Sequence, residues 1–343
     1  MPDSTHSAPA APAAALRRAA FFRAALDVLA QSARVCRELF AIMIPVVIGV
    51  KLLQELGAVP YLAWPLKPLM ALAGLPPEMG LVWATALLNN IYSAIIVFLT
   101  LDTSALTQAQ VTVLATLILV AHNLPVELSI ARKSGARLRF QLAARFLGAL
   151  ILGMILNAAY SSLGLLQDPA AVLFARPEAG ADPSLWLWAW GEAQKLGSIA
   201  LIITALMALM RLLSAVGAIA LLNRLLRPVL AMIGIGPAAS SLTVAGLTLG
   251  VTYGAGLIIH EARSGRVDKR DVFFSMTLMG LCHSLIEDTL LMAMLGAQLS
   301  GILWARLVFA LLATALLVKV TARLAPQLAD RLLWSTLART PAP

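Results

Sequence analysis

Long apolar runs are the feature that most constrains how this chain can fold. Of its 343 residues, 60% are hydrophobic and 13% are charged, whereas an average soluble domain is about 45–50% apolar and about 25% charged. The runs consist of Leu, Ala, Ile, Val and Met without the polar–apolar alternation typical of an outer-membrane barrel. Because backbone groups in lipid must be satisfied within helices, the sequence predicts an all-α polytopic membrane protein.

Ten apolar segments are candidates for membrane helices, since a span needs about 20 apolar residues. In the first half of the chain they are 37–59, a short 61–75, 77–101, 107–130 and 140–165. In the second half they are 192–219, a short 220–235, 237–259, 272–295 and 300–324. The two short segments contain Lys67-Pro68 and Arg227-Pro228, and the sequence leaves open whether they span the membrane or re-enter it.

Basic residues predict the orientation of the segments, because Lys and Arg are enriched in cytoplasmic loops. This rule also accounts for the net charge of +9, so no nucleic-acid partner is expected. One loop carries five basic residues and no acid: Arg132, Lys133, Arg137, Arg139 and Arg145. The long segment before the sixth span carries most of the nearby acids, including Asp168, Glu178, Asp182 and Glu192, and is predicted to be external. We expect a bacterial-type inner membrane, several crossings and both termini in the cytoplasm.

These features predict five parts of the chain. They are a cytoplasmic tail and interfacial helix (1–36), a first repeat (37–165), an external loop (166–191), a second repeat (192–324) and a cytoplasmic tail (325–343).

The two halves resemble each other when one is shifted by 161 positions. His122 then falls on His283, Glu127 on Asp288, and Tyr92 on Tyr253. Five crossings per half would place the second copy upside down in the membrane. Inverted repeats are the architecture of many secondary transporters, in which broken helices meet near the bilayer midplane and form the substrate site.

Three motifs of the first half resemble a known family. They are Pro-Pro-Glu-Met-Gly (76–80), Asn-Asn-Ile-Tyr-Ser-Ala (89–94) and His-Asn-Leu-Pro-Val-Glu (122–127), and they are similar to the nucleoside recognition, or Gate, domain. That domain occurs in spore maturation proteins A and B, with related modules in ferrous-iron permeases and concentrative nucleoside transporters. The resemblance covers about 37–324 as two fused copies and implies membrane passage of a small solute. The chain lacks the GTPase domain of the iron permeases, and Gly250-Val251 replaces Asn89-Asn90 in the second copy.

Ionisable residues lie near the middle of two predicted spans, where they are costly and usually face a bundle interior. His122 is followed by Glu127, and His283 by Glu287 and Asp288. These residues predict a paired polar centre at the repeat interface that binds the substrate. The alternative is that each histidine bonds a neighbouring carbonyl and each acid pairs with a loop arginine.

A second polar patch interrupts an apolar run of the first half and is mirrored in the second. We expect broken helices there, with substrate-binding side chains: Asn89, Asn90, Tyr92, Ser93, Thr252 and Tyr253. The alternative is that these groups only hold the helices together by hydrogen bonds.

The expected function is therefore a transporter or facilitator of a small polar solute, for which a nucleoside-like molecule is one candidate. No ATP machinery is encoded, so the passage would be gradient-driven, with H⁺ or Na⁺ as candidate coupling ions. One alternative is a divalent metal permease, with His122, His283, Glu287 and Asp288 as candidate ligands beside Glu127, since nitrogen and oxygen ligands suit Fe²⁺, Mn²⁺ or Zn²⁺. Another is a non-transporting membrane scaffold. We expect no enzyme activity and no resident cofactor. The expected partners are the solute or ion, the lipid bilayer and further copies of the chain in a homo-oligomer.

Overall fold

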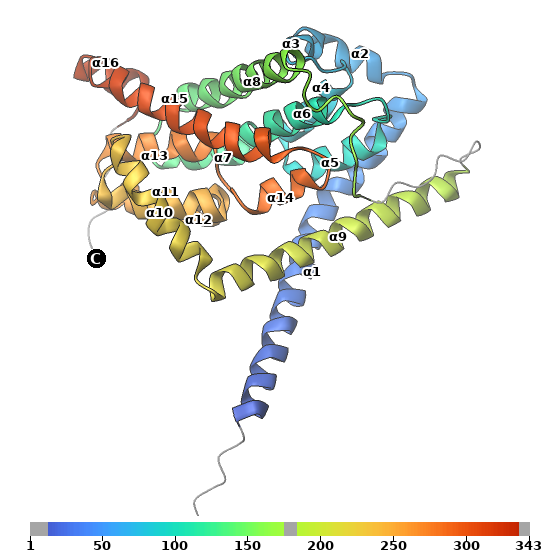
Figure 1. The fold of residues 1–343 in the computed structure, drawn as a ribbon, viewed down its shortest axis with the longest axis horizontal. Coiled ribbons are helices and arrows are strands. Elements are labelled where there is room, and N and C mark those ends of the chain that lie inside the picture. Colours follow the sequence, from blue (N-terminus) through green and yellow to red (C-terminus); the bar gives the residue numbers. More distant parts are fainter. Residues whose placement is uncertain (1–12, 175–183, 336–343) are drawn as a thin grey trace, which may run out of the picture.

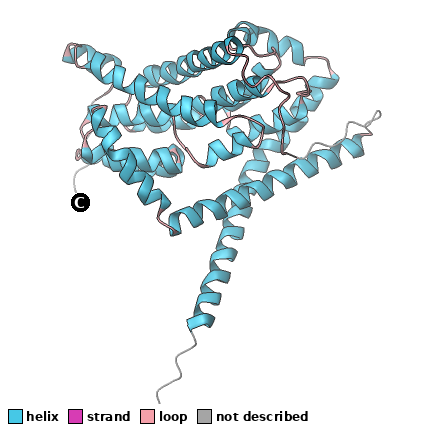
Figure 2. Ribbon diagram, viewed as in Figure 1, coloured by secondary structure: helices cyan, strands magenta, loops and turns pink. Residues whose placement is uncertain are grey.

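A computed structural model describes residues 13–174 and 184–335 of the chain. Every regular element in these two ranges is helical (Figure 2). Four helical segments are long and apolar enough to cross a membrane: Gln108–Lys133, which a break divides in two, Leu138–Ser162, Leu185–Ala215 and Ser300–Thr321. Shorter apolar helices accompany them. The predicted all-α polytopic membrane protein is confirmed.

Helices α1 to α8 make up the first half of the chain and α9 to α16 the second (Figure 1). The first half contains α1 (Ala13–Glu55), α2 (Val59–Ala63), η1 (Trp64–Leu66), α3 (Lys67–Leu72), α4 (Met79–Leu88), α5 (Ile91–Thr100), α6 (Gln108–Val120), α7 (Leu124–Lys133) and α8 (Leu138–Ser162). The second contains α9 (Leu185–Ala215), α10 (Ala218–Met232), α11 (Pro237–Leu249), α12 (Val251–Ser264), α13 (Lys269–Leu281), α14 (Glu287–Ala293), the π-helical turn η2 (Ser300–Ala305), α15 (Arg306–Thr321) and α16 (Pro326–Leu332).

Four predicted spans are broken into pairs of short helices. The breaks lie at Asn89-Asn90 between α4 and α5, and at Gly250 between α11 and α12, as expected from the polar and glycine residues there. Two further breaks separate α6 from α7 and α13 from α14, where Asn123 and Ser284 adopt left-handed backbone conformations with φ of 49° and 47°.

The freed backbone groups at the second pair of breaks bond to neighbouring helices. Asn123 N donates to Ala86 O at 2.8 Å, and Leu285 N donates to Leu247 O at 2.8 Å. Irregular backbone is tolerated at membrane depth where protein supplies such partners.

The repeat is visible in the helix boundaries as well as in the sequence. Helices α6 and α13 have the same length, and both their first and last residues are 161 positions apart. Asn123 and Ser284, the left-handed residues that follow them, are separated by the same interval.

Contacts between equivalent helices show that the repeats are inverted. Gly148 of α8 lies against Phe309 of α15, whereas Leu156, further along α8, lies against Gly301, before the start of α15. The two equivalent helices are therefore antiparallel. Gly148 and Phe309 are themselves equivalent positions, so their contact lies on the pseudo-twofold axis that relates the repeats.

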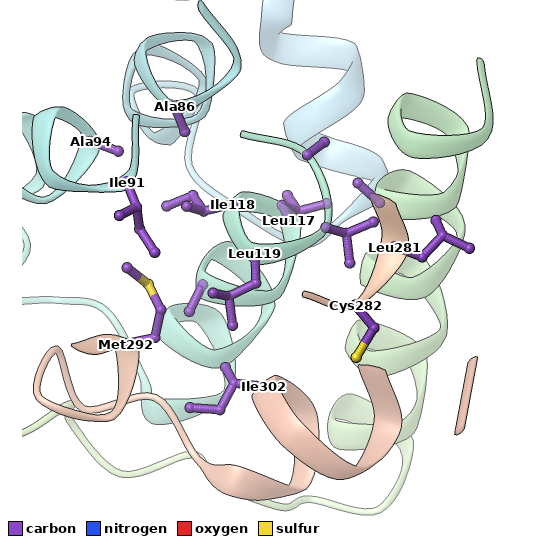
Figure 3. Close-up of a cluster of buried hydrophobic side chains, with 14 of the residues drawn as sticks. Ala86, Ile91, Ala94, Leu117, Ile118, Leu119, Leu281, Cys282, Met292 and Ile302 are labelled. Carbon is purple, nitrogen blue, oxygen red and sulfur yellow. The ribbon is translucent and has the colours of Figure 1, made fainter. Parts of the chain in front are cut away.

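The core lies around α6 and α13, whose side chains are buried on almost every face. Figure 3 shows Leu117, Ile118 and Leu119 of α6 among apolar side chains from both repeats, including Ile91 and Met292. In a membrane such contacts hold helices together through van der Waals packing rather than through exclusion of water.

Helix α1 differs from the prediction. An interfacial helix was expected before a separate span at 37–59, but α1 is one helix of 43 residues that continues through Pro45. No glycine interrupts this helix before Gly49, and Pro45 does not end it. Figure 1 shows α1 crossing α9 and extending away from the bundle. A hydrogen bond between Ser32 and Thr204 links the crossing helices.

Helix α9 begins at Leu185, inside the predicted external loop 166–191, because Ser184 caps it by accepting from Leu187 N. Glu192, expected in an external segment, is therefore buried in α9 and paired with Lys195 at 2.7 Å. The predicted loop acids Glu178 and Asp182 lie outside the described residues.

The short helix α16 is docked at the end of the described chain through Asp330. Its carboxylate accepts from Lys269 Nζ at 2.6 Å and from Trp334 Nε1 at 2.5 Å. These hydrogen bonds hold the pKa of Asp330 below its usual value.

Candidate functional site

His122 and His283 come from equivalent positions of the two repeats and meet on the pseudo-twofold axis. Each ring places Nδ1 2.9 Å from the carbonyl oxygen four residues earlier, Ile118 O for one and Met279 O for the other. A carbonyl only accepts, so each Nδ1 carries a proton, and in a neutral ring Nε2 then carries the lone pair. The two Nε2 atoms lie 3.2 Å apart.

The breaks after α6 and α13 place these rings. Each histidine follows the last hydrogen-bonded turn of its helix and precedes the left-handed residue, Asn123 or Ser284. The chain turns there, so each imidazole stays at the broken helix end, buried between the repeats with 6% of His122 and 3% of His283 exposed.

Glu127 joins the two rings. Its Oε1 lies 3.3 Å from His283 Nε2 and 3.7 Å from His122 Nε2. Its Oε2 accepts from Arg145 Nη1 at 2.7 Å. The sequence predicted this carboxylate at the centre, and the structure brings it there.

Arg145 was predicted in the cytoplasmic basic loop, and this prediction is wrong. Helix α8 already begins at Leu138, so Arg145 lies about two turns into it and is buried. Besides bonding Glu127, it donates from Nε to Val120 O at 3.1 Å and from Nη2 to His122 O at 2.9 Å. One guanidinium therefore holds both the carboxylate and the broken end of α6.

The second repeat contributes Asp288 and Glu287. Asp288 Oδ2 lies 4.0 Å from His122 Nε2. Glu287 Oε1 accepts from Tyr92 OH at 3.2 Å, a bond that joins the two repeats.

Arg306 lies 161 positions after Arg145 but makes different bonds. Its Nη2 donates to Thr289 Oγ1 at 3.2 Å. Its Nε and Nη1 atoms are buried without a hydrogen-bond partner among the described residues. Arg145 and Glu127 therefore form an ion pair in the first repeat. Within the described residues, Arg306 forms no such pair with Asp288.

A cavity of about 420 Å³ opens beside this polar centre. Both histidines, Glu127, Glu287 and Asp288 line it, together with Asn90 and Tyr92. Glu38 and Leu39 of α1 and Ile203 and Met207 of α9 cover it, so the crossing of these helices closes one side.

The other residues predicted to bind substrate belong to the polar patch of the first half and its counterpart in the second. Asn90 Oδ1 accepts from Ser93 N at 2.9 Å and caps α5, and Asn89 Nδ2 donates to Ser93 Oγ at 2.9 Å. Asn89 and Ser93 are absent from the lining of the cavity described above, and their bonds are local ones at the start of α5 rather than bonds between distant helices. The side chains of Thr252 and Tyr253 lie outside the described part of the structure.

Four residues of the centre were not predicted as site residues: Arg145, Arg306, Asn123 and Ser284. The signal that could have found the arginines is the repeat itself, because a shift of 161 positions takes Arg145 to Arg306.

The chain has a relative in Bacillus subtilis (strain 168), the uncharacterized membrane protein YvoD. The two are 31% identical over 278 residues, which cover 80% of this chain and 87% of the relative. No family model matches the chain, so its resemblance to the Gate domain stays a prediction. No solved structure matches it either.

Proposed function

This chain belongs to the family of the membrane protein YvoD, and from that premise we propose that it is a gradient-driven transporter or facilitator of a small polar solute. The solute would bind between the inverted repeats, in the cavity beside the two histidines. Inverted repeats with broken helices around a central polar site are the architecture of many secondary transporters.

The observation that carries this proposal is the polar centre on the pseudo-twofold axis. Two histidines, two buried acids and a buried arginine lie together between the repeats and beside a cavity of about 420 Å³. Ionisable groups at membrane depth are costly, and they commonly mark substrate or ion pathways. The centre lines a cavity that a solute could occupy, which favours transport over the scaffold alternative.

The cavity also has the size and polarity of a small-solute site. Asn90 and Tyr92, from the motif that resembles the Gate domain, line it together with the histidines. A nucleoside is therefore one suitable probe, and a divalent cation is the other.

Flux through proteoliposomes tests the proposal. The purified chain is reconstituted with an outward-directed or inward-directed gradient of radiolabelled uridine, and separately of Co²⁺. We expect flux of at least one probe, and a loss of at least tenfold in the His122→Ala, His283→Ala double variant, because the centre then lacks both rings.

His260→Ala is the matched control, since His260 is exposed and lies at the end of α12 outside the cavity. It should transport like the natural chain. Equal flux in the double variant and the control, or no flux of either probe, would contradict the proposal.

A further inference from the structure

Three atoms with lone pairs converge at the centre of the bundle. They are Nε2 of His122, Nε2 of His283 and a carboxylate oxygen of Glu127, and all lie within 4.8 Å of one another. Because both Nδ1 protons are already donated to carbonyls, neither ring has a second proton in its neutral form to donate across the gap. Three acceptors facing one another in a buried site repel unless a proton or a metal ion lies between them.

The distances between these atoms match the edges of a coordination tetrahedron. Metal–ligand bonds of about 2.0–2.1 Å to imidazole nitrogen and carboxylate oxygen give edges of about 3.3–3.4 Å. The measured separations are 3.2 Å between the two nitrogens, and 3.3 and 3.7 Å from Glu127 Oε1 to His283 and His122. The ligand atoms therefore need only small movements to surround one ion.

We infer that His122, His283 and Glu127 bind one divalent transition-metal ion, and that such an ion is the transported solute. The second part rests on the proposed function. Imidazole ligands suit Zn²⁺, Fe²⁺, Co²⁺ and related ions, whereas Ca²⁺ and Mg²⁺ require sets of oxygen ligands.

The groups behind the ligands orient them, as the outer hydrogen-bond partners of metal ligands do. Ile118 O and Met279 O fix the tautomer and the direction of the two rings. Arg145 fixes Glu127 by its bond to Oε2, which leaves Oε1 directed at the rings.

The fourth position of the tetrahedron lies open to exchange. Asp288 Oδ2 is 4.0 Å from His122 Nε2 and lines the cavity, so it can approach a bound ion or leave room for water. The charge of Arg145 offsets that of Glu127, which weakens the attraction of the site for a cation. Weak enough binding to permit release is what conduction requires.

Binding of Co²⁺ to the purified full-length chain tests the site without any transport assay. Four-coordinate Co²⁺ has visible d–d absorption, which reports both occupancy and geometry. We expect one Co²⁺ per chain in the natural sequence and in His260→Asn, and at least a tenfold weaker affinity in His122→Asn and in His283→Asn.

His283→Cys guards against variants that merely fail to fold. A thiolate at this position should restore Co²⁺ binding and add a sulfur-to-cobalt charge-transfer band that the natural chain lacks. Absence of Co²⁺ binding by the natural chain, or binding that is the same in both histidine variants, would overturn the inference.

Flux in proteoliposomes that contain a Co²⁺-sensitive dye separates the inference from the proposed function. Histidine-dependent Co²⁺ binding with histidine-dependent Co²⁺ flux supports both. Histidine-dependent binding with no flux of Co²⁺ or uridine keeps the metal site but overturns transport. Uridine flux without any Co²⁺ binding keeps transport but overturns the metal site.

Discussion

Arg145 is the residue whose loss should most disturb the polar centre, because it is the only ion-pair partner of Glu127 other than the histidines among the described residues. Removing one member of a buried ion pair leaves an uncompensated charge and costs about 3–5 kcal/mol. We expect Arg145→Met to lower the thermal unfolding midpoint of the detergent-solubilised chain clearly, whereas Arg139→Met, on an exposed position of the same helix, should leave it unchanged.

The double variant Arg145→Met, Glu127→Gln provides the second arm of this test. It removes both charges, so much of the lost stability should return. Equal midpoints for Arg145→Met and Arg139→Met would contradict the buried pair.

For single residues, the sequence predicted the histidines and acids of the centre well. They lie deep inside apolar runs, and most of them recur after 161 positions. It failed for Arg145 because five basic residues lie close together in sequence, and proximity to Arg137 and Arg139 suggested a loop. Arg139 and Arg145 both lie in α8, and only Arg145 is buried against the other helices.

The broken helices depend on two left-handed residues, Asn123 and Ser284. Left-handed backbone costs most L-residues about 1–2 kcal/mol, and asparagine and glycine tolerate it best. We expect Asn123→Gly to unfold at nearly the natural temperature and Asn123→Val to unfold several degrees lower. Asn223→Val, at a helical position of α10, controls for loss of an asparagine. An Asn123→Val variant as stable as this control would contradict the argument.

The sequence showed where two spans are broken, but not that α1 is continuous. Asn89-Asn90 and Gly250 interrupt apolar runs with residues that rarely continue a helix, so breaks there were expected. The continuity of α1 was not expected, because an amphipathic segment followed by an apolar one has the same sequence pattern whether or not the helix ends between them. Pro45 lies inside α1 without ending it.

The two repeats of the whole molecule have different arginine contacts. Arg145 bonds Glu127 and the end of α6, whereas Arg306 bonds Thr289. Alternating access in inverted-repeat transporters moves one repeat against the other around a fixed site. We therefore expect a second state in which the roles are exchanged and Arg306 bonds Asp288.

Access to the cavity from each side of the membrane tests this exchange. Asn90→Cys, in a background with Cys36 and Cys282 replaced, places a thiol at the cavity lining. Impermeant thiol reagents should label it from both sides of oriented vesicles, and Arg306→Met should restrict labelling to one side. Labelling that Arg306→Met does not alter would rule out the exchange.

The sequence predicted this global arrangement through the duplication, which fixes how the halves correspond. It did not predict how α1 and α9 cross, because their contact involves side chains such as Ser32 and Thr204 that carry no motif.

The position of His122 and His283 on the symmetry axis means that neither half of the gene encodes both imidazoles of the site. A single half, expressed alone, would have to meet a copy of itself inserted in the reverse direction before two imidazoles could face each other. Fusion in one polypeptide removes that requirement, because the same chain then supplies a second repeat that is already antiparallel to the first.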